Sequence, residues 1–94
     1  MKTRNIIWLE DVVQKLAWKH NVEKDEVEEV LRGKPKFRYV ERGDRPGEDL
    51  YVALGRTESG RYLSVIFVYK LSFDALVLSA RDMNKMERKW YAKK

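Results

Sequence analysis

Apolar positions in the first third of the chain recur with the period of an α-helix. They fall at spacings i, i+3, i+4, i+7 and i+8 and so share one helical face: Leu9, Val12, Val13, Leu16 and Ala17. This pattern predicts a helix from about Leu9 to His20. A second helix is predicted from about Lys24 to Arg32, with acidic residues in its first turns, where the helix dipole favours them. Gly33 and Pro35 are typical of a helix end.

After Pro35 the period of apolar residues changes from 3.6 to 2, which predicts strands. The most β-like run, from Arg61 to Tyr69, is apolar at both its odd and its even positions, so we expect it to be the central strand with helices covering at least one side of the sheet. Glycine-rich turns separate the runs. The four predicted strands are Phe37–Val40, Leu50–Gly55, Arg61–Tyr69 and Ala75–Ala80.

A capping box predicts where the last helix begins. Asn84 is followed three residues later by Glu87, so each side chain can bind the backbone amide of the other residue. The helix is expected to run to about Lys93, with Met86 and Trp90 packing inward. Together these elements predict one α+β domain over residues 1–94. It has an antiparallel sheet of about four strands, two N-terminal helices and one C-terminal helix.

Composition narrows the range of possible chemistry. The chain has 94 residues and no cysteine, which excludes disulfides, a thiolate nucleophile and a cysteine-based zinc site. The apolar run Ile6–Leu9 is too short for a membrane span, so we expect a cytoplasmic protein with no membrane partner. A single histidine, His20, cannot build a metal site by itself, and no nucleotide-binding motif occurs. No cofactor and no metal are expected.

The positive charge lies in the second half of the chain. Residues 1–49 hold 11 basic and 11 acidic residues, whereas residues 50–94 hold nine basic and four acidic ones. A field of one sign on part of a surface attracts polyanions or an acidic protein. The alternative is a solvated helix face that only keeps the protein soluble.

The amino-acid sequence resembles that of the BrnT family of type II toxins over about Trp8 to Tyr91. The matching segments, in order, are Trp8, Lys19-His20-Asn21-Val22, Ala53-Leu54-Gly55-Arg56, Gly60-Arg61-Tyr62-Leu63, Ser79-Ala80-Arg81, Glu87-Arg88 and Tyr91. The resemblance implies a RelE-like fold, a ribonuclease activity that blocks translation, and a small DNA-binding antitoxin similar to BrnA. This sequence also departs from the family's pattern. Leu76 stands where many members carry an arginine, Val12 and Leu16 replace polar residues, and Asn21 replaces glycine.

Three residues are candidates for catalysis. Arg61 and Arg81 lie at strand ends, where guanidinium groups could hold a phosphate at two points and stabilise charge in the transition state. The sequence hypothesis is that both converge on one phosphate. Alternatively Arg61 is a surface residue and Arg81 pairs with Asp82 or Glu87. For Glu87, the capping role competes with a role as general base.

RNA binding is predicted for Arg56, Arg88 and Tyr91. Arg88 and Tyr91 lie three apart on the last helix, so the arginine could contact phosphate while the tyrosine stacks on a base. A metal-independent endoribonuclease fits this set, because the ribose 2′-hydroxyl supplies the nucleophile. We expect the antitoxin to cover Arg81, Arg88 or both, with ribosome association and a homodimer or hetero-tetramer as open possibilities. The competing functions are a non-catalytic binding module and a toxin with a non-RNA target.

Overall fold

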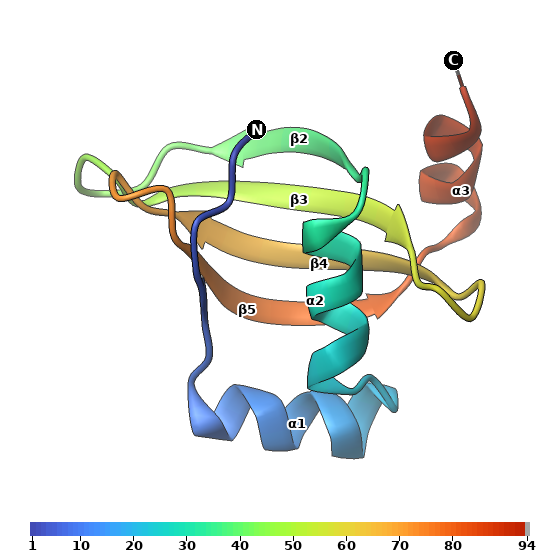
Figure 1. The fold of residues 1–94 in the computed structure, drawn as a ribbon. Helices are drawn as coiled ribbons and strands as arrows, with labels where there is room; N and C mark the ends of the chain where they lie inside the picture. Colours follow the sequence, from blue (N-terminus) through green and yellow to red (C-terminus); the bar gives the residue numbers. More distant parts are fainter. Residues whose placement is uncertain (94) are drawn as a thin grey trace.

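The computed structural model describes residues 1–93 and contains a five-stranded sheet with three helices (Figure 1). The strand order across the sheet is β1-β5-β4-β3-β2. Along the chain the elements are β1 (Ile6–Ile7), α1 (Glu10–His20), α2 (Lys24–Arg32), β2 (Lys36–Glu41), β3 (Asp49–Arg56), β4 (Tyr62–Tyr69), β5 (Ala75–Asp82) and α3 (Lys85–Ala92).

The α+β class and the central position of β4 are confirmed. Strands β2 to β5 form an antiparallel meander, in which Leu54 lies opposite Ser64 and Ser64 lies opposite Arg81. The predicted count of four strands was one too low, because β1 pairs in parallel with β5 through only two residues, Ile6 and Ile7. A two-residue strand leaves no alternating pattern to detect in the sequence.

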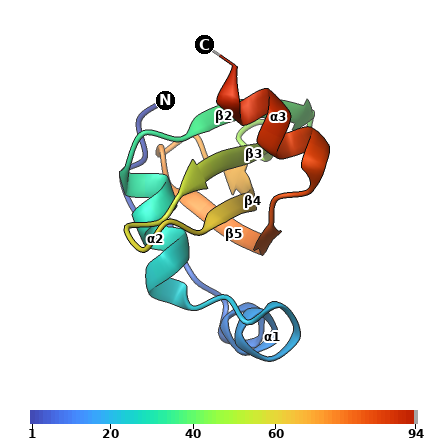
Figure 2. The ribbon, with the colours of Figure 1, turned by 90° about the vertical axis from the view of Figure 1, so that its right-hand side faces the viewer.

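The helices lie on both sides of the sheet. Figure 2 shows α1 and α2 on one side and α3 on the other, at one end of the sheet. The core fills the space under α1 and α2, where Leu63, Val65 and Phe67 of β4 are fully buried. A Cβ on Gly55 would lie 2.8 Å from Val30 Cγ1, so the glycine lets α2 approach β3 closely.

Helix α3 begins as the sequence predicted. The Asn84 side chain accepts a hydrogen bond from the Glu87 amide at 2.8 Å, and the Glu87 carboxylate accepts one from the Asn84 amide at 2.9 Å. The expected inward packing of Met86 was wrong, since Met86 is 77% exposed. Helix α3 covers only the end of the sheet, so this position faces solvent. Within residues 1–93 no helix is long and apolar enough to cross a membrane.

Candidate active site

An arginine, a glutamate and a serine meet between the sheet and α3. Ser64 and Arg81 are register partners on the adjacent strands β4 and β5, so their side chains leave the same face of the sheet. Glu87 reaches them from the first turn of α3. Its Oε1 accepts from Arg81 Nη1 at 2.7 Å, and its Oε2 accepts from Arg81 Nη2 at 2.9 Å and from Ser64 Oγ at 3.2 Å. The arginine is therefore held at two points against the end of the sheet.

Both members of the ion pair are held in their charged forms. Partial burial of Glu87 by itself raises its pKa, but hydrogen bonds from Arg81, from the Asn84 amide and from Ser64 outweigh that effect, and the pKa is lowered. The hydrogen bonds from Arg81 to Glu87 in turn raise the pKa of Arg81. Glu87 is therefore an acceptor-only carboxylate at neutral pH and has no proton to donate.

Within residues 1–93, the carboxylate of the Arg81–Glu87 pair has all its acceptor positions filled, whereas the guanidinium keeps free donors. A carboxylate offers about four lone-pair positions, and Glu87 fills them with the Asn84 amide, Ser64 and two contacts from Arg81. Arg81 gives one further hydrogen bond to the carbonyl of Asp82 at 3.0 Å. Among the described residues its remaining N–H groups have no acceptor, and the side chain is 40% exposed. Arg81 can therefore donate to a bound anion without breaking its contact with Glu87.

Arg61 does not converge on this pair. Its guanidinium points to the junction of α1 and α2, where it donates to the carbonyls of Asn21 at 2.6 Å and His20 at 3.1 Å. It also forms ion pairs with Glu26 at 3.1 Å and Asp82 at 2.7 Å. The hydrogen bonds that Arg61 donates to the Asp82 carboxylate are the main reason that the pKa of Arg61 is raised. The expected convergence of the two arginines is wrong for this structure, because the partners of Arg61 lie on the side of the sheet that α1 and α2 cover.

The three residues predicted to bind RNA gather around one tyrosine. The guanidinium carbon of Arg88 lies 4.2 Å from the centre of the Tyr62 ring, and that of Arg56 lies 5.4 Å from it. Tyr91 packs edge-on against the same ring at 6.0 Å. The prediction omitted Tyr62. Two signals for Tyr62 were available: its position directly after Arg61 at the start of β4, and its place in the segment Gly60-Arg61-Tyr62-Leu63 that resembles the family. Cations stacked on an aromatic ring beside α3 form a surface on which phosphates and bases can both bind.

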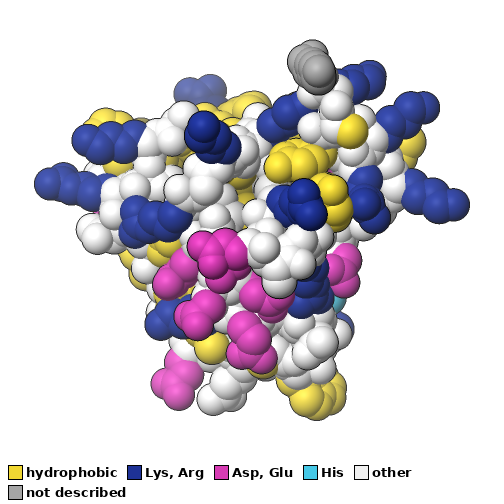
Figure 3. Space-filling model, turned by 45° about the vertical axis from the view of Figure 1, so that its right-hand side comes forward, with side chains coloured by type: hydrophobic (Ala, Val, Ile, Leu, Met, Phe, Trp, Pro, Cys, Tyr) yellow, Lys and Arg dark blue, Asp and Glu magenta, His cyan; other side chains and the backbone are white. Residues whose placement is uncertain are grey.

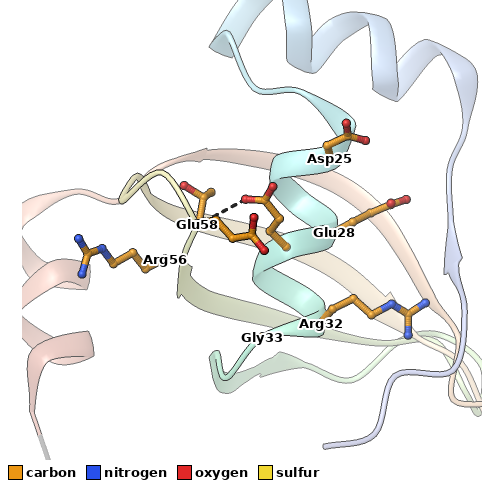
Figure 4. A pocket seen from close by; sticks show the side chains of 8 residues that line it. Asp25, Glu28, Arg32, Gly33, Arg56 and Glu58 are labelled. Atoms are coloured by element: carbon orange, nitrogen blue, oxygen red, sulfur yellow. Dashed lines mark hydrogen bonds between the residues drawn. The ribbon is translucent and has the colours of Figure 1, made fainter.

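The opposite charges are separated on the surface. Figure 3 shows acidic side chains gathered mainly in the lower half of the view, with basic side chains around the upper half, where α3 lies. A hollow of about 540 Å³ lies between α2 and the turn after β3. Figure 4 shows the side chains that line it and the hydrogen bond that the Glu58 amide donates to Glu29. Four carboxylates line the hollow, from Asp25, Glu28, Glu29 and Glu58, against the two arginines Arg32 and Arg56. A polyanion is therefore favoured at the α3 end and disfavoured over α2.

Within residues 1–93 no three carboxylate or histidine side chains gather as a metal site would require. One end of the sheet thus combines a guanidinium held by a glutamate, two further arginines over a tyrosine ring and a second tyrosine edge-on to that ring, and groups of these kinds bind phosphates and bases. The family model of BrnT, the ribonuclease toxin of type II toxin-antitoxin systems, matches residues 8–87, and the chain belongs to this family. No curated protein matches the chain.

Proposed function

We propose that this protein is a metal-independent endoribonuclease that cleaves cellular RNA in the cytoplasm, blocks translation, and is held inactive by a BrnA-like antitoxin. Family membership supports a ribonuclease toxin. The observation that carries the proposal for this chain is the Arg81–Glu87 pair, which fixes a guanidinium at two points and leaves it donors for a substrate phosphate.

The proposed reaction needs no cofactor. The ribose 2′-oxygen attacks the adjacent phosphorus, the bond to the 5′-oxygen breaks, and the products are a 2′,3′-cyclic phosphate and a 5′-hydroxyl. The proton of the 2′-hydroxyl leaves to an acceptor, and the 5′-oxygen takes up a proton from water. Negative charge builds on the phosphoryl oxygens in between, and Arg81 stabilises it.

Glu87 acts in this proposal by holding Arg81. To accept the proton of a 2′-hydroxyl it would first have to release one of its four donors. The longest of these contacts is the one from Ser64, at 3.2 Å. The role of general base therefore stays a hypothesis with its own test in the Discussion. Arg61 is assigned to the junction of α1 and α2 and not to the reaction.

Arg56, Arg88 and Tyr91 bind the RNA strand in this proposal, together with Tyr62. The antitoxin is proposed to cover Arg81, Arg88 or both, because an exposed cationic site can be neutralised by an acidic segment. Leu76, which replaces the family arginine, lies five residues along β5 from Arg81, roughly 17 Å away. The Arg81–Glu87 pair forms with leucine at position 76, so we propose that the chain is active without the family arginine there.

Induced expression without an antitoxin tests the function in cells, and purified protein with single-stranded RNA tests it directly. Growth arrest, cleavage that persists in excess EDTA, and 2′,3′-cyclic phosphate ends are expected for the parent. Arg81→Ala is the matched inactive control. Growth arrest with intact RNA would favour a toxin with a different target. The absence of both growth arrest and RNA cleavage would favour a non-catalytic binding module.

A further inference from the structure

A groove beside α3 is lined by basic side chains that have no role in the proposed function. Two adjoining hollows, of about 600 and 290 Å³, share Arg38, Leu54 and Glu87 in their walls. Arg38 comes from β2 and Leu54 from β3, and both are on the same face of the sheet as Ser64 and Arg81. The groove therefore opens next to the Arg81–Glu87 pair.

The lining combines the two kinds of side chain that hold single-stranded nucleic acid. Arg38, Lys89 and Lys93 supply positive charge, while Leu54, Met86 and Trp90 supply apolar surface. The single acid in the walls of the larger hollow is Glu87, whose charge is already paired with Arg81. A base can stack on the indole while the cations hold its phosphates.

Arg38 is available to a ligand. It is exposed, and within residues 1–93 it forms no ion pair or side-chain hydrogen bond. Three strand spacings of about 4.8 Å separate β2 from β5, and Arg38 lies two residues along the strands from the row that holds Arg81, so the two backbone positions are roughly 16 Å apart. Two long side chains that extend toward each other over that span can contact phosphates of the same strand.

From this arrangement we propose that the groove is a nucleotide subsite. Arg38 contacts a phosphate next to the one that is cleaved, and Trp90 stacks on the base between them. This proposal rests on the proposed function and extends it to the RNA segment that passes between β2 and α3. The acidic hollow over α2 is excluded as an RNA path by its four carboxylates.

Binding of a non-cleavable probe tests the subsite separately from the chemistry. The probe is a fluorescent single-stranded oligoribonucleotide with 2′-O-methyl groups on every ribose, titrated with protein at several salt concentrations. Arg38→Ala should weaken binding and lower the slope of log affinity against log salt by about 0.7. Trp90→Leu should weaken binding roughly fivefold to a hundredfold with an unchanged slope.

Arg42→Ala is the matched control. Arg42 is exposed just beyond the end of β2 and does not line the groove, so its loss should leave binding within about twofold of the parent. Equal affinities and slopes for Arg38→Ala and Arg42→Ala would overturn the subsite. If Trp90→Leu lowers the melting temperature strongly, the two arginine variants alone decide.

Cleavage of an unmodified RNA separates the two proposals. A parent protein that cleaves RNA while Arg38→Ala binds and cleaves like Arg42→Ala would overturn the subsite and keep the ribonuclease. A parent that cleaves nothing, with a specific loss of probe binding in Arg38→Ala, would keep the subsite and overturn the ribonuclease.

Discussion

Glu87 binds both terminal nitrogens of Arg81, at 2.7 and 2.9 Å, with the same carboxylate that closes the capping box of α3. One side chain thus joins the start of a helix to the end of a strand. The start of α3 and the guanidinium of Arg81 are fixed relative to each other by this link. Such preorganisation is what a charge-stabilising group requires, because it needs no rearrangement when the substrate reacts.

Arg81→Ala should remove cleavage while the protein stays folded. Loss of one charge-stabilising donor from a preorganised site costs about 2.7–4 kcal/mol of transition-state stabilisation, or roughly a hundred- to a thousandfold in rate. Arg81→Lys should restore little, since an ammonium cannot make the two-point contact with Glu87. Single-turnover cleavage assays and circular dichroism measure the two properties. Parent rates in both variants would place the active site elsewhere.

Arg61→Ala should lower stability and leave the chemistry largely intact. The substitution removes charged hydrogen bonds to the junction of α1 and α2, each worth about 1.5–3 kcal/mol. A loss of about 2 kcal/mol corresponds to roughly 8–16 °C in melting temperature for a domain of this size. Urea unfolding and cleavage at low temperature test this. A variant with parent stability and no cleavage would instead support the catalytic role expected from the sequence.

Local signals in the sequence predicted the elements well. The capping box of Asn84 and Glu87 and the continuous apolar run of β4 depend on neighbours within a few residues, and both appear in the structure. The role of Arg61 depends on Asn21, 40 positions away, which no local pattern encodes.

The site was only partly predictable for the same reason. Arg81 was chosen because it ends a strand near the last helix, and that position brings it to Glu87. Tyr62 and Arg38 reach the α3 end of the sheet through strand register. A shift of one residue in register would turn both side chains to the opposite face. The sequence alone did not determine the register.

Acid should weaken the fold through two carboxylates. The pKa of Asp82 is lowered chiefly by its hydrogen bond from Arg61, and that of Glu87 is lowered despite its burial. Their ordinary values are 3.8 and 4.5. A lowered folded-state pKa stabilises the protein fully above the ordinary value, and the stabilisation is lost as pH falls through the folded-state pKa.

The free energy of unfolding should therefore be nearly constant from pH 7 to about 5 as far as these two groups are concerned, and should fall below about pH 4.5. Urea titrations at several pH values measure it. The double variant Asp82→Asn/Glu87→Gln should show a shallower acid dependence than the parent. An equally steep decline in the double variant would assign the acid sensitivity to other carboxylates.

Lys36→Met should loosen the C-terminal turn of α3. The Lys36 ammonium donates to the carbonyls of Trp90 and Lys93 and lies 5.7 Å from the centre of the Trp90 ring. A cation at a helix C-terminus contributes about 0.3–1 kcal/mol. Amide exchange in the last turn should become faster, while Lys34→Met, an exposed lysine two residues earlier, serves as control. Unchanged exchange in both variants would show that other contacts hold this turn.

Glu87→Gln distinguishes positioning from proton transfer. Glutamine keeps one carbonyl oxygen for the Asn84 amide, so the cap of α3 and the melting temperature should be largely preserved. It loses the charge that holds Arg81 at two points. We therefore expect cleavage to fall about tenfold, less than the 10²–10⁴-fold expected for loss of a general base.

The size of the rate loss, measured beside a matched control, decides between the two roles of Glu87. The pKa of Glu87 lies below its ordinary value of 4.5, so Glu87 is deprotonated from pH 5 to 8 under either role and the parent's rate profile in that range does not separate them. Glu41→Gln, at an exposed carboxylate at the end of β2, is the control and should cleave at the parent rate. A variant that loses more than a hundredfold while keeping its melting temperature would assign Glu87 to the chemistry, because the cap and the fold would then be intact and only the proton acceptor missing.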